Sequence, residues 1–190
     1  MKKMLARCGV LVAVVVSLAA LPPSVAESKV SYPDPKSFKI DAPFSMGKVD
    51  LADSIFDGKE KWGGNPKCKL KSSGTVCKWG NENSADGMAL MYADGDINSH
   101  LNTILIEFGS KNNGQPIINQ ASPLTKFFTT RGKVSLGSSA QRVADIDPAS
   151  MQEFGGGFFL TSSTGARMFF LTGGPNDKFV TGIVLTDQPI

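Results

Sequence analysis

The stretch KCKLKSSGTVCKW, residues 67–79, indicates a β-hairpin. Before its Ser-Ser-Gly turn, lysine alternates with less polar residues, which is the period expected of a strand with one solvated face. Gly74 supplies the positive φ that a tight loop needs. We therefore expect antiparallel strands at 67–71 and 75–79.

The first 26 residues, 1–26, have the parts of an export signal. Three basic residues precede an apolar run at 9–20, and small residues precede a predicted cleavage after Ala26. The run is shorter than the roughly 20 residues that span a bilayer. We expect a periplasmic or secreted protein without stable membrane insertion, with an uncleaved anchor as the alternative.

Charge argues against a nucleic-acid partner. The net charge of the whole chain is +3, and the segment 1–26 holds three basic residues and no acidic one. The mature chain is therefore neutral and has no global basic field to attract nucleic acid.

Two cysteines, Cys68 and Cys77, remain after removal of the signal, which carries Cys8. They flank the turn of the expected hairpin, and an even number of cysteines in an oxidising compartment predicts a disulfide. The spacing is not the Cys-x-x-Cys of redox motifs. We interpret the bond as a structural staple that stabilises the fold by roughly 2–3 kcal/mol on the chain-entropy model.

The hairpin sequence is echoed later in the chain, since LKSSG at 70–74 resembles LTSSTG at 160–165. Further colinear matches pair Ser45-Met46-Gly47 with Ser135-Leu136-Gly137, Leu51-Ala52-Asp53 with Val143-Ala144-Asp145, and Trp62-Gly63-Gly64 with Phe154-Gly155-Gly156. The conserved order favours an internal duplication. In the second copy, Phe158 and Met168 replace the cysteines, and we expect them to form a cross-strand apolar pair.

Each copy is expected to begin with a short helix, at 48–56 and at 139–146, because apolar residues recur there at helical spacing. The stretch 123–132 has Pro near its start and Gly at its end, which predicts another helix before the second sheet. The expected strands lie at 67–71, 75–79, 87–93 and 102–108 in the first copy, and at 157–162, 166–172 and 178–186 in the second. The loops are too short for parallel crossovers, so the strands should be antiparallel.

The predicted fold class is therefore α+β, with two tandem units. Each unit has a short helical segment (helix-turn-helix) followed by an antiparallel β-sheet of three to four strands. The first repeat unit covers 27–118, with the disulfide hairpin and an inserted loop, and the second covers 119–190.

Two segments carry a resemblance to known families: FSMGKVDLADSIF at 44–56 and VSLGSSAQRVADI at 134–146. Their apolar-Gly-x-polar opening into a helix, present twice in an exported chain, resembles the β-lactamase inhibitory protein family. It is also similar to the small outer-membrane assembly lipoproteins, which have one such unit. The Leu-Gly-x-Pro of those lipoproteins is represented only by the stretch 62–66, and there is no lipobox.

No catalytic or metal-binding motif is evident. His100 is the only histidine, and no serine lies in a Gly-x-Ser-x-Gly context. One histidine and two bridged cysteines cannot complete a tetrahedral zinc site. The stretch 94–98 opens like a calcium loop, but the twelfth position is Leu105 rather than glutamate. We predict a non-enzyme without metal or cofactor. A hydrolase built on two carboxylates that meet only in the fold stays open.

The remaining signal is an insertion. In the first copy, residues 80–101 precede the final strand, whereas in the second copy only the few residues between 171 and 178 do so. Extra loop length is where binding specificity tends to lie, although a solubilising loop beside a core tryptophan is the alternative. The predicted partner-binding residues are Trp62, Trp79, Tyr92, Asp94, Asp96 and His100.

These features predict an exported module that binds another protein. The specific hypothesis is an inhibitor or immunity-type protein that occludes an envelope or secreted enzyme. The alternative is a structural factor in assembly of the bacterial cell envelope. Packing of the two tryptophans in the core, rather than at an interface, is the competing interpretation of those residues.

Overall fold

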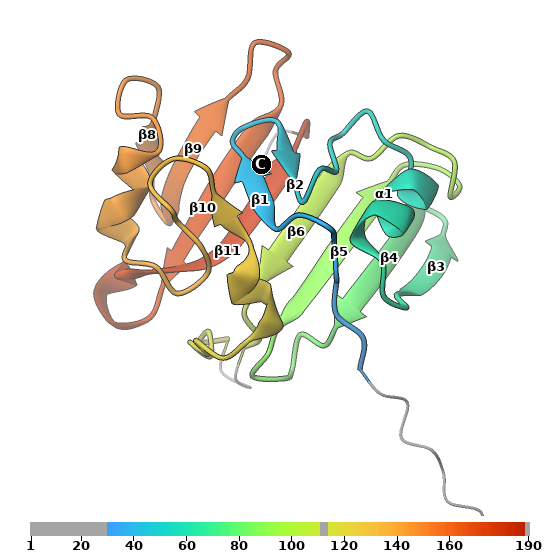
Figure 1. Ribbon diagram of the computed structural model, residues 1–190, viewed down its shortest axis with the longest axis horizontal. Coiled ribbons are helices and arrows are strands. Elements are labelled where there is room, and N and C mark those ends of the chain that lie inside the picture. Colours follow the sequence, from blue (N-terminus) through green and yellow to red (C-terminus); the bar gives the residue numbers. More distant parts are fainter. Residues whose placement is uncertain (1–29, 111–113, 189–190) are drawn as a thin grey trace, which may run out of the picture.

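The computed structural model describes residues 30–110 and 114–188, and most of them belong to one large antiparallel sheet (Figure 1). The predicted export signal at 1–26 lies outside the described residues, so cleavage after Ala26 stays a prediction. No helix in the described part of the chain combines the length and apolar character needed to span a membrane.

The large sheet has eight strands in the order β3-β4-β5-β6-β11-β10-β9-β8. Each half of the order is an antiparallel meander of four strands, and the two meanders meet where β6 pairs with β11. The strands are β3 (Lys67–Lys71), β4 (Gly74–Gly80), β5 (Met88–Ala93), β6 (Thr103–Glu107), β8 (Gln152–Phe154), β9 (Gly157–Thr161), β10 (Arg167–Gly173) and β11 (Phe179–Thr186).

Short elements cover one face of this sheet. A three-stranded sheet has the order β2-β1-β7, and helix α1 stands beside it in front of the large sheet in Figure 1. The bounds are β1 (Lys39–Asp41), β2 (Ser45–Met46), α1 (Ile55–Trp62), β7 (Phe128–Thr129) and the 3-10 helices η1 (Pro123–Lys126), η2 (Ala140–Asp145) and η3 (Pro175–Asp177).

Helix α1 is fixed at both ends. Ser54 forms a capping box with Asp57, in which each side chain bonds the other's backbone N–H. At the other end, the Trp62 indole donates to the Met46 carbonyl at 2.9 Å and meets the Trp79 ring edge-on, with centroids 5.3 Å apart. Gly58 lets the helix approach the sheet, because a Cβ there would lie 2.7 Å from the Met91 sulfur.

The predicted α+β fold of two tandem helix-plus-sheet units is wrong. The described chain is mostly β, with a single helix of seven or more residues and one continuous eight-stranded sheet. One hydrophobic cluster contains side chains from both halves of the sheet, including Met91, Ile106, Phe170 and Ile183. Neither half therefore has a core of its own.

The expected helices fail for a local reason. The segment 48–56 is mostly turns, because the Asp50 carboxylate accepts from Ala52 N at 2.9 Å and the Asp53 carboxylate accepts from Asp50 N at 3.0 Å. Such side chains take backbone donors that a helix would use. The segment 139–146 forms only a 3-10 helix, and 123–132 is a short 3-10 helix followed by β7.

The strand predictions fare better. All seven expected segments are present, as β3, β4, β5, β6, β9, β10 and β11. The Cys68–Cys77 disulfide is also present, between residues that face each other across β3 and β4.

The expected pair between Phe158 and Met168 is wrong. Met168 faces Leu160, and Phe158 faces Phe170. Residues 162–166 join β9 to β10, whereas only residues 72 and 73 join β3 to β4, and the longer loop moves the register by two residues. A shift of two keeps these side chains on the same face.

Candidate functional site

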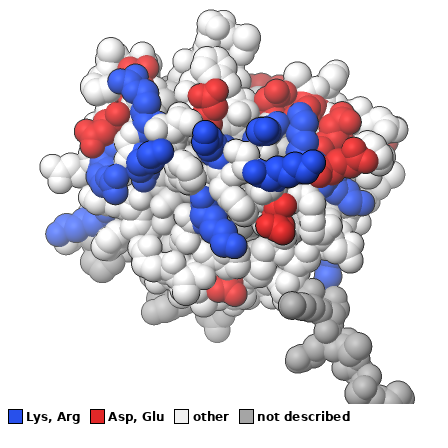
Figure 2. All heavy atoms as spheres, viewed as in Figure 1, with Lys and Arg blue, Asp and Glu red and all other residues white. Residues whose placement is uncertain are grey.

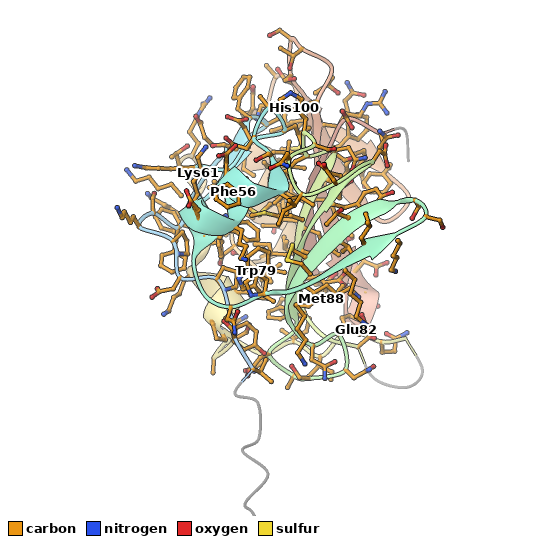
Figure 3. All side chains as sticks on the ribbon, turned by 90° about the vertical axis from the view of Figure 1, so that its right-hand side faces the viewer. Phe56, Lys61, Trp79, Glu82, Met88 and His100 are labelled. Atoms are coloured by element: carbon orange, nitrogen blue, oxygen red, sulfur yellow. A yellow bond between two sulfur atoms is a disulfide. The ribbon has the colours of Figure 1, made fainter. Side chains whose placement is uncertain are left out.

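The large sheet has a covered face and an open face. Trp79, Met91 and Ile104 point into the core, and Figure 3 places Trp79 on the α1 side of the sheet. Their chain neighbours Lys78, Leu90 and Leu105 point the opposite way because side chains alternate along a strand. None of these three outward side chains belongs to the core cluster. We call this second surface the open face.

The open face has three regions in a row across the sheet. Lysines stand at one end on β3 and β4, apolar residues occupy the centre on β5, β6 and β11, and phenylalanines stand at the other end on β8 to β10. The lysine end is Lys67, Lys69, Lys71 and Lys78; the apolar centre is Leu90, Tyr92, Leu105 and Val184; the aromatic end is Phe154, Phe159 and Phe169.

The lysine end borders a hollow of about 370 Å³, with Val76 and Met88 among its lining residues. The described residues form two salt bridges, Lys61 with Asp53 and Lys78 with Glu82, so the three lysines of β3 are left without an ion pair. Burial raises the pKa of Glu107 above its ordinary value, and the nearby Glu82 raises it further, against the opposing effect of Lys78. This end of the face is therefore a predominantly cationic surface.

The aromatic end is a packed cluster. The rings of Phe159 and Phe169 stack with centroids 5.4 Å apart, and Phe154 meets Phe169 edge-on at 5.7 Å. Such ring pairs stabilise their arrangement beyond the effect of area burial. Phe169 is only 5% exposed, so the apolar surface at this end of the sheet is that of the half-buried Phe154 and Phe159.

A second feature is a pocket of about 450 Å³ at the ends of β5, β6 and β11, which we call the polar pocket. Its lining includes Asp94, His100, Asn102 and Asp187. Asn102 is only 5% exposed, yet its side-chain nitrogen and oxygen have no hydrogen-bond partner. Leaving a buried amide unpartnered costs on the order of 1–3 kcal/mol.

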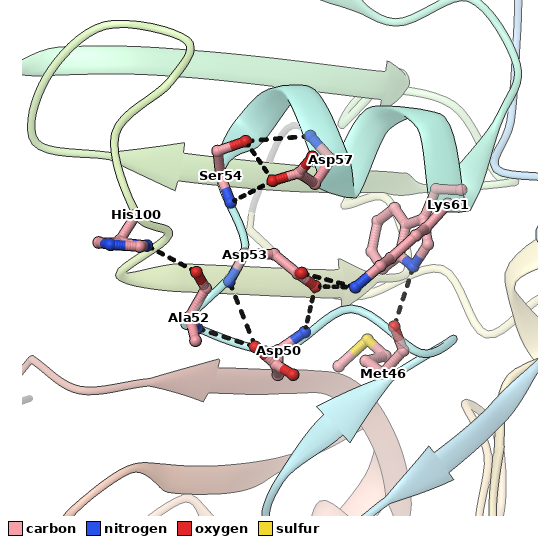
Figure 4. Close-up of polar contacts among 9 residues, drawn as sticks. Met46, Asp50, Ala52, Asp53, Ser54, Asp57, Lys61 and His100 are labelled. Atoms are coloured by element: carbon pink, nitrogen blue, oxygen red, sulfur yellow. Dashed lines mark hydrogen bonds and ion pairs between the residues drawn. The ribbon is translucent and has the colours of Figure 1, made fainter.

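The wall of the polar pocket is held by a network around the start of α1 (Figure 4). The His100 imidazole bonds the Ala52 carbonyl through Nδ1 at 2.6 Å, and because a carbonyl only accepts, Nδ1 carries the hydrogen. Leu101 N donates to the Asp53 carbonyl at 2.8 Å. The Asp53 carboxylate in turn bonds the Lys61 ammonium at 2.5 and 2.6 Å.

The structure separates the predicted partner-binding residues. Trp62 and Trp79 are buried and bond backbone carbonyls through their indole nitrogens, so they are core residues rather than exposed anchors. Tyr92 lies on the open face, half-buried, and its hydroxyl donates to the Ser73 carbonyl.

The three remaining predicted residues lie in the turn after β5. Asp94 and His100 both line the polar pocket. The Asp96 carboxylate accepts from Asn98 N at 2.8 Å and closes the turn itself. Sequence reasoning missed Asn102 and the aromatic end, because neither a buried unpartnered amide nor a face assignment leaves a motif.

Two general findings bear on the chemistry. Within the described residues, no three or more histidine, cysteine, aspartate or glutamate side chains are grouped so as to hold a metal ion. The covered side of the molecule mixes basic and acidic side chains over its surface (Figure 2).

Comparison with models of protein families gives no match, and neither curated proteins nor solved structures match the chain. The functional argument therefore rests on the open face and the polar pocket themselves.

Proposed function

We propose that this protein is a binding module that docks another protein on the open face. The observation that carries the proposal is the apolar centre, where Leu90, Leu105 and Val184 point away from the core on three adjacent strands. A sheet usually buries an apolar face against a second layer. The described residues place their helices and second sheet against the other face, so a partner would supply this layer.

The composition of the open face fits an interface. Interfaces combine a core that is rich in aromatic and apolar residues with a polar, solvent-accessible rim. Here the aromatic end is pre-ordered by ring stacking, and the three β3 lysines of the lysine end have no ion pair among the described residues. Charge complementarity favours a partner with an acidic patch that meets Lys67, Lys69 and Lys71.

The more specific proposal is an inhibitor or immunity-type protein that covers the active site of an envelope or secreted enzyme. A rigid sheet loses little conformational entropy on binding, which suits tight occlusion. The disulfide between β3 and β4 holds the lysine end in place, which supports a pre-organised surface.

Affinity capture with matched variants tests this proposal. The open-face variant carries Leu90→Ser and Leu105→Ser, and the control carries Phe44→Ser and Phe56→Ser, which replace rings that are 52% and 47% exposed outside the open face. Each protein is checked by circular dichroism and then incubated with envelope extract and culture fluid of the exporting cell.

We expect wild type and control to retain the same enzyme, the open-face variant to lose it, and added wild type to inhibit that enzyme. Equal recovery by all three proteins, or no recovery by a folded wild type, contradicts docking on the open face. Recovery of cell-wall or assembly components through the open face, without inhibition, would instead favour a role in envelope assembly.

A further inference from the structure

The polar pocket contains one buried side chain that the fold leaves unsatisfied. The backbone of Asn102 is fully used, since its N–H donates to the Tyr92 carbonyl at 3.0 Å and its carbonyl accepts from Thr186 Oγ1 at 2.8 Å. Its side-chain Nδ2 and Oδ1 have no partner although the residue is buried. Buried polar groups are nearly always hydrogen-bonded. The described chain therefore provides no hydrogen-bond partner for the Asn102 side-chain amide.

The missing partner has a defined chemistry. A carboxamide offers a donor and an acceptor side by side, so its full complement is a group that accepts at Nδ2 and donates at Oδ1. Another amide, such as a peptide group, meets both requirements at once. A carboxylate has no hydrogen to donate to Oδ1. A single hydroxyl carries its donor and its acceptor on one oxygen, so it also meets the two requirements less completely.

The other lining residues of the polar pocket favour a positively charged ligand. Asp94 and Asp187 are both exposed at the pocket, and its lining residues include no lysine or arginine. The half-buried Leu51 adds apolar surface beside them. Long basic side chains lay their methylene stem on apolar surface while the charged group reaches carboxylates.

We infer that the polar pocket binds a basic amino-acid residue, whose cationic side-chain group lies on Asp94 and Asp187. Because the Asn102 amide atoms are enclosed, the Asn102 side chain turns toward the pocket to meet an amide of the ligand backbone. The pocket volume of about 450 Å³ lies in the range of ligand sites. This inference does not rest on the proposed function, because the pocket lies at the strand ends and its test uses small ligands only.

Two sources of such a residue are distinguishable. In one, the residue belongs to a polypeptide segment and has amides on both sides. In the other, the ligand is free arginine or lysine, whose α-carboxylate would be repelled by Asp94 and Asp187. Acetyl-Gly-Arg-Gly-amide represents the first source and free arginine the second.

Titration followed by ¹H–¹⁵N NMR tests the site directly. The probe is Nα-acetyl-arginine amide, and its near-isosteric neutral control is Nα-acetyl-citrulline amide. The side-chain NH₂ signals of Asn102 are assigned by their loss in Asn102→Leu. The charge variant is Asp94→Asn with Asp187→Asn. Asp96→Asn is the control, because it removes one carboxylate charge from the same turn as Asp94 but outside the pocket lining.

We expect a saturable shift of the Asn102 NH₂ signals, with a dissociation constant of about 1 mM or below. The charge variant should weaken binding about tenfold or more, Asn102→Leu should abolish it, and Asp96→Asn should leave it unchanged. Without ligand, Asn102→Leu should raise Tm by about 2–4 °C, because an apolar group replaces an unpartnered amide.

Three results overturn the inference. The first is no shift of the Asn102 signals with the capped arginine, the capped tripeptide or free arginine. The second is equal binding of the citrulline control. The third combines two observations: Tm falls in Asn102→Leu, and in wild type a water contact to the Asn102 NH₂ persists when ligand is present. A buried water would then be the missing partner.

Discussion

The β3–β4 and β9–β10 hairpins, which lie toward opposite ends of the sheet, are stabilised in different ways. In β9, Leu160 is only 2% exposed and belongs to the common core, together with Val143 and Ile146 from the η2 region. In β3, all five residues are exposed, and Leu70 is 74% exposed although it points to the covered side. The disulfide joins β3 to β4. A covalent bond thus stabilises the edge that the covering layer does not reach.

The largest expected effect separates the two leucines at equivalent places in their hairpins. Leu160→Ala should lower the free energy of unfolding by about 2–4 kcal/mol, because it leaves a cavity in the core. Leu70→Ala should change it by less than about 0.5 kcal/mol, since the side chain is already in solvent. Urea denaturation of both variants measures the difference. Similar losses would mean that β3 is covered in solution, and the comparison would fail.

The second effect concerns the staple. Replacing both cysteines, Cys68→Ala with Cys77→Ala, should destabilise the protein by about 2–3 kcal/mol through loss of loop closure in the unfolded chain. Reductant should lower the stability of wild type to that of the variant and leave the variant unchanged. Hydrogen exchange in β3 should accelerate more than in β9. Uniform acceleration in both strands would remove the distinction between the two hairpins.

The third effect compares the elements that cover each half. Ser54 caps α1 through its side chain, whereas Ser139, which precedes η2, makes no such bond. Ser54→Ala should therefore lower the free energy of unfolding by about 1 kcal/mol, and Ser139→Ala should leave it almost unchanged. Thermal melting of the two variants under the same conditions gives the answer. An equal cost at Ser139 would indicate a cap that forms only in solution.

The smallest effect is at the junction of the two halves, where Glu107 on β6 faces Gly182 on β11. Burial raises the pKa of Glu107 in the folded state. The folded state therefore binds this proton more tightly than the unfolded state, and stability is lost as pH rises through the raised pKa. As pH rises through the raised pKa, the free energy of unfolding of Glu107→Gln should increase relative to that of wild type. Above that pKa, the difference between the two proteins should stay constant. A constant difference between the two proteins from acid to neutral pH would contradict this.

The strands could be predicted because their signal is local. Alternation and turn residues determine a hairpin such as β3–β4 within fifteen or so residues. The helices could not be predicted correctly. Asp50 and Asp53 divert the backbone donors before α1, and Gly58, a poor helix former, lies inside α1 where the helix approaches Met91 closely. The strands β1, β2 and β7 have two or three residues and show no period in sequence.

The candidate site was predicted only in part, for a related reason. Asp94 and His100 stood out because they lie in a polar turn, and the structure places both at the polar pocket. Trp62 and Trp79 were misassigned because a tryptophan looks alike in sequence whether it fills a core or an interface. Asn102 has no signature, since its lack of a partner depends on β5, β6 and β11 together.

The strand order also sets when the sheet can close. β11 is the last strand of the described chain, yet it lies at the centre of the sheet between β6 and β10. During synthesis, β6 has no partner on its β11 side until residues 179–186 have been made. Loss of those residues would divide the sheet into two separate pieces rather than trim its border. The two halves of the sheet can therefore join only after residues 179–186 are available.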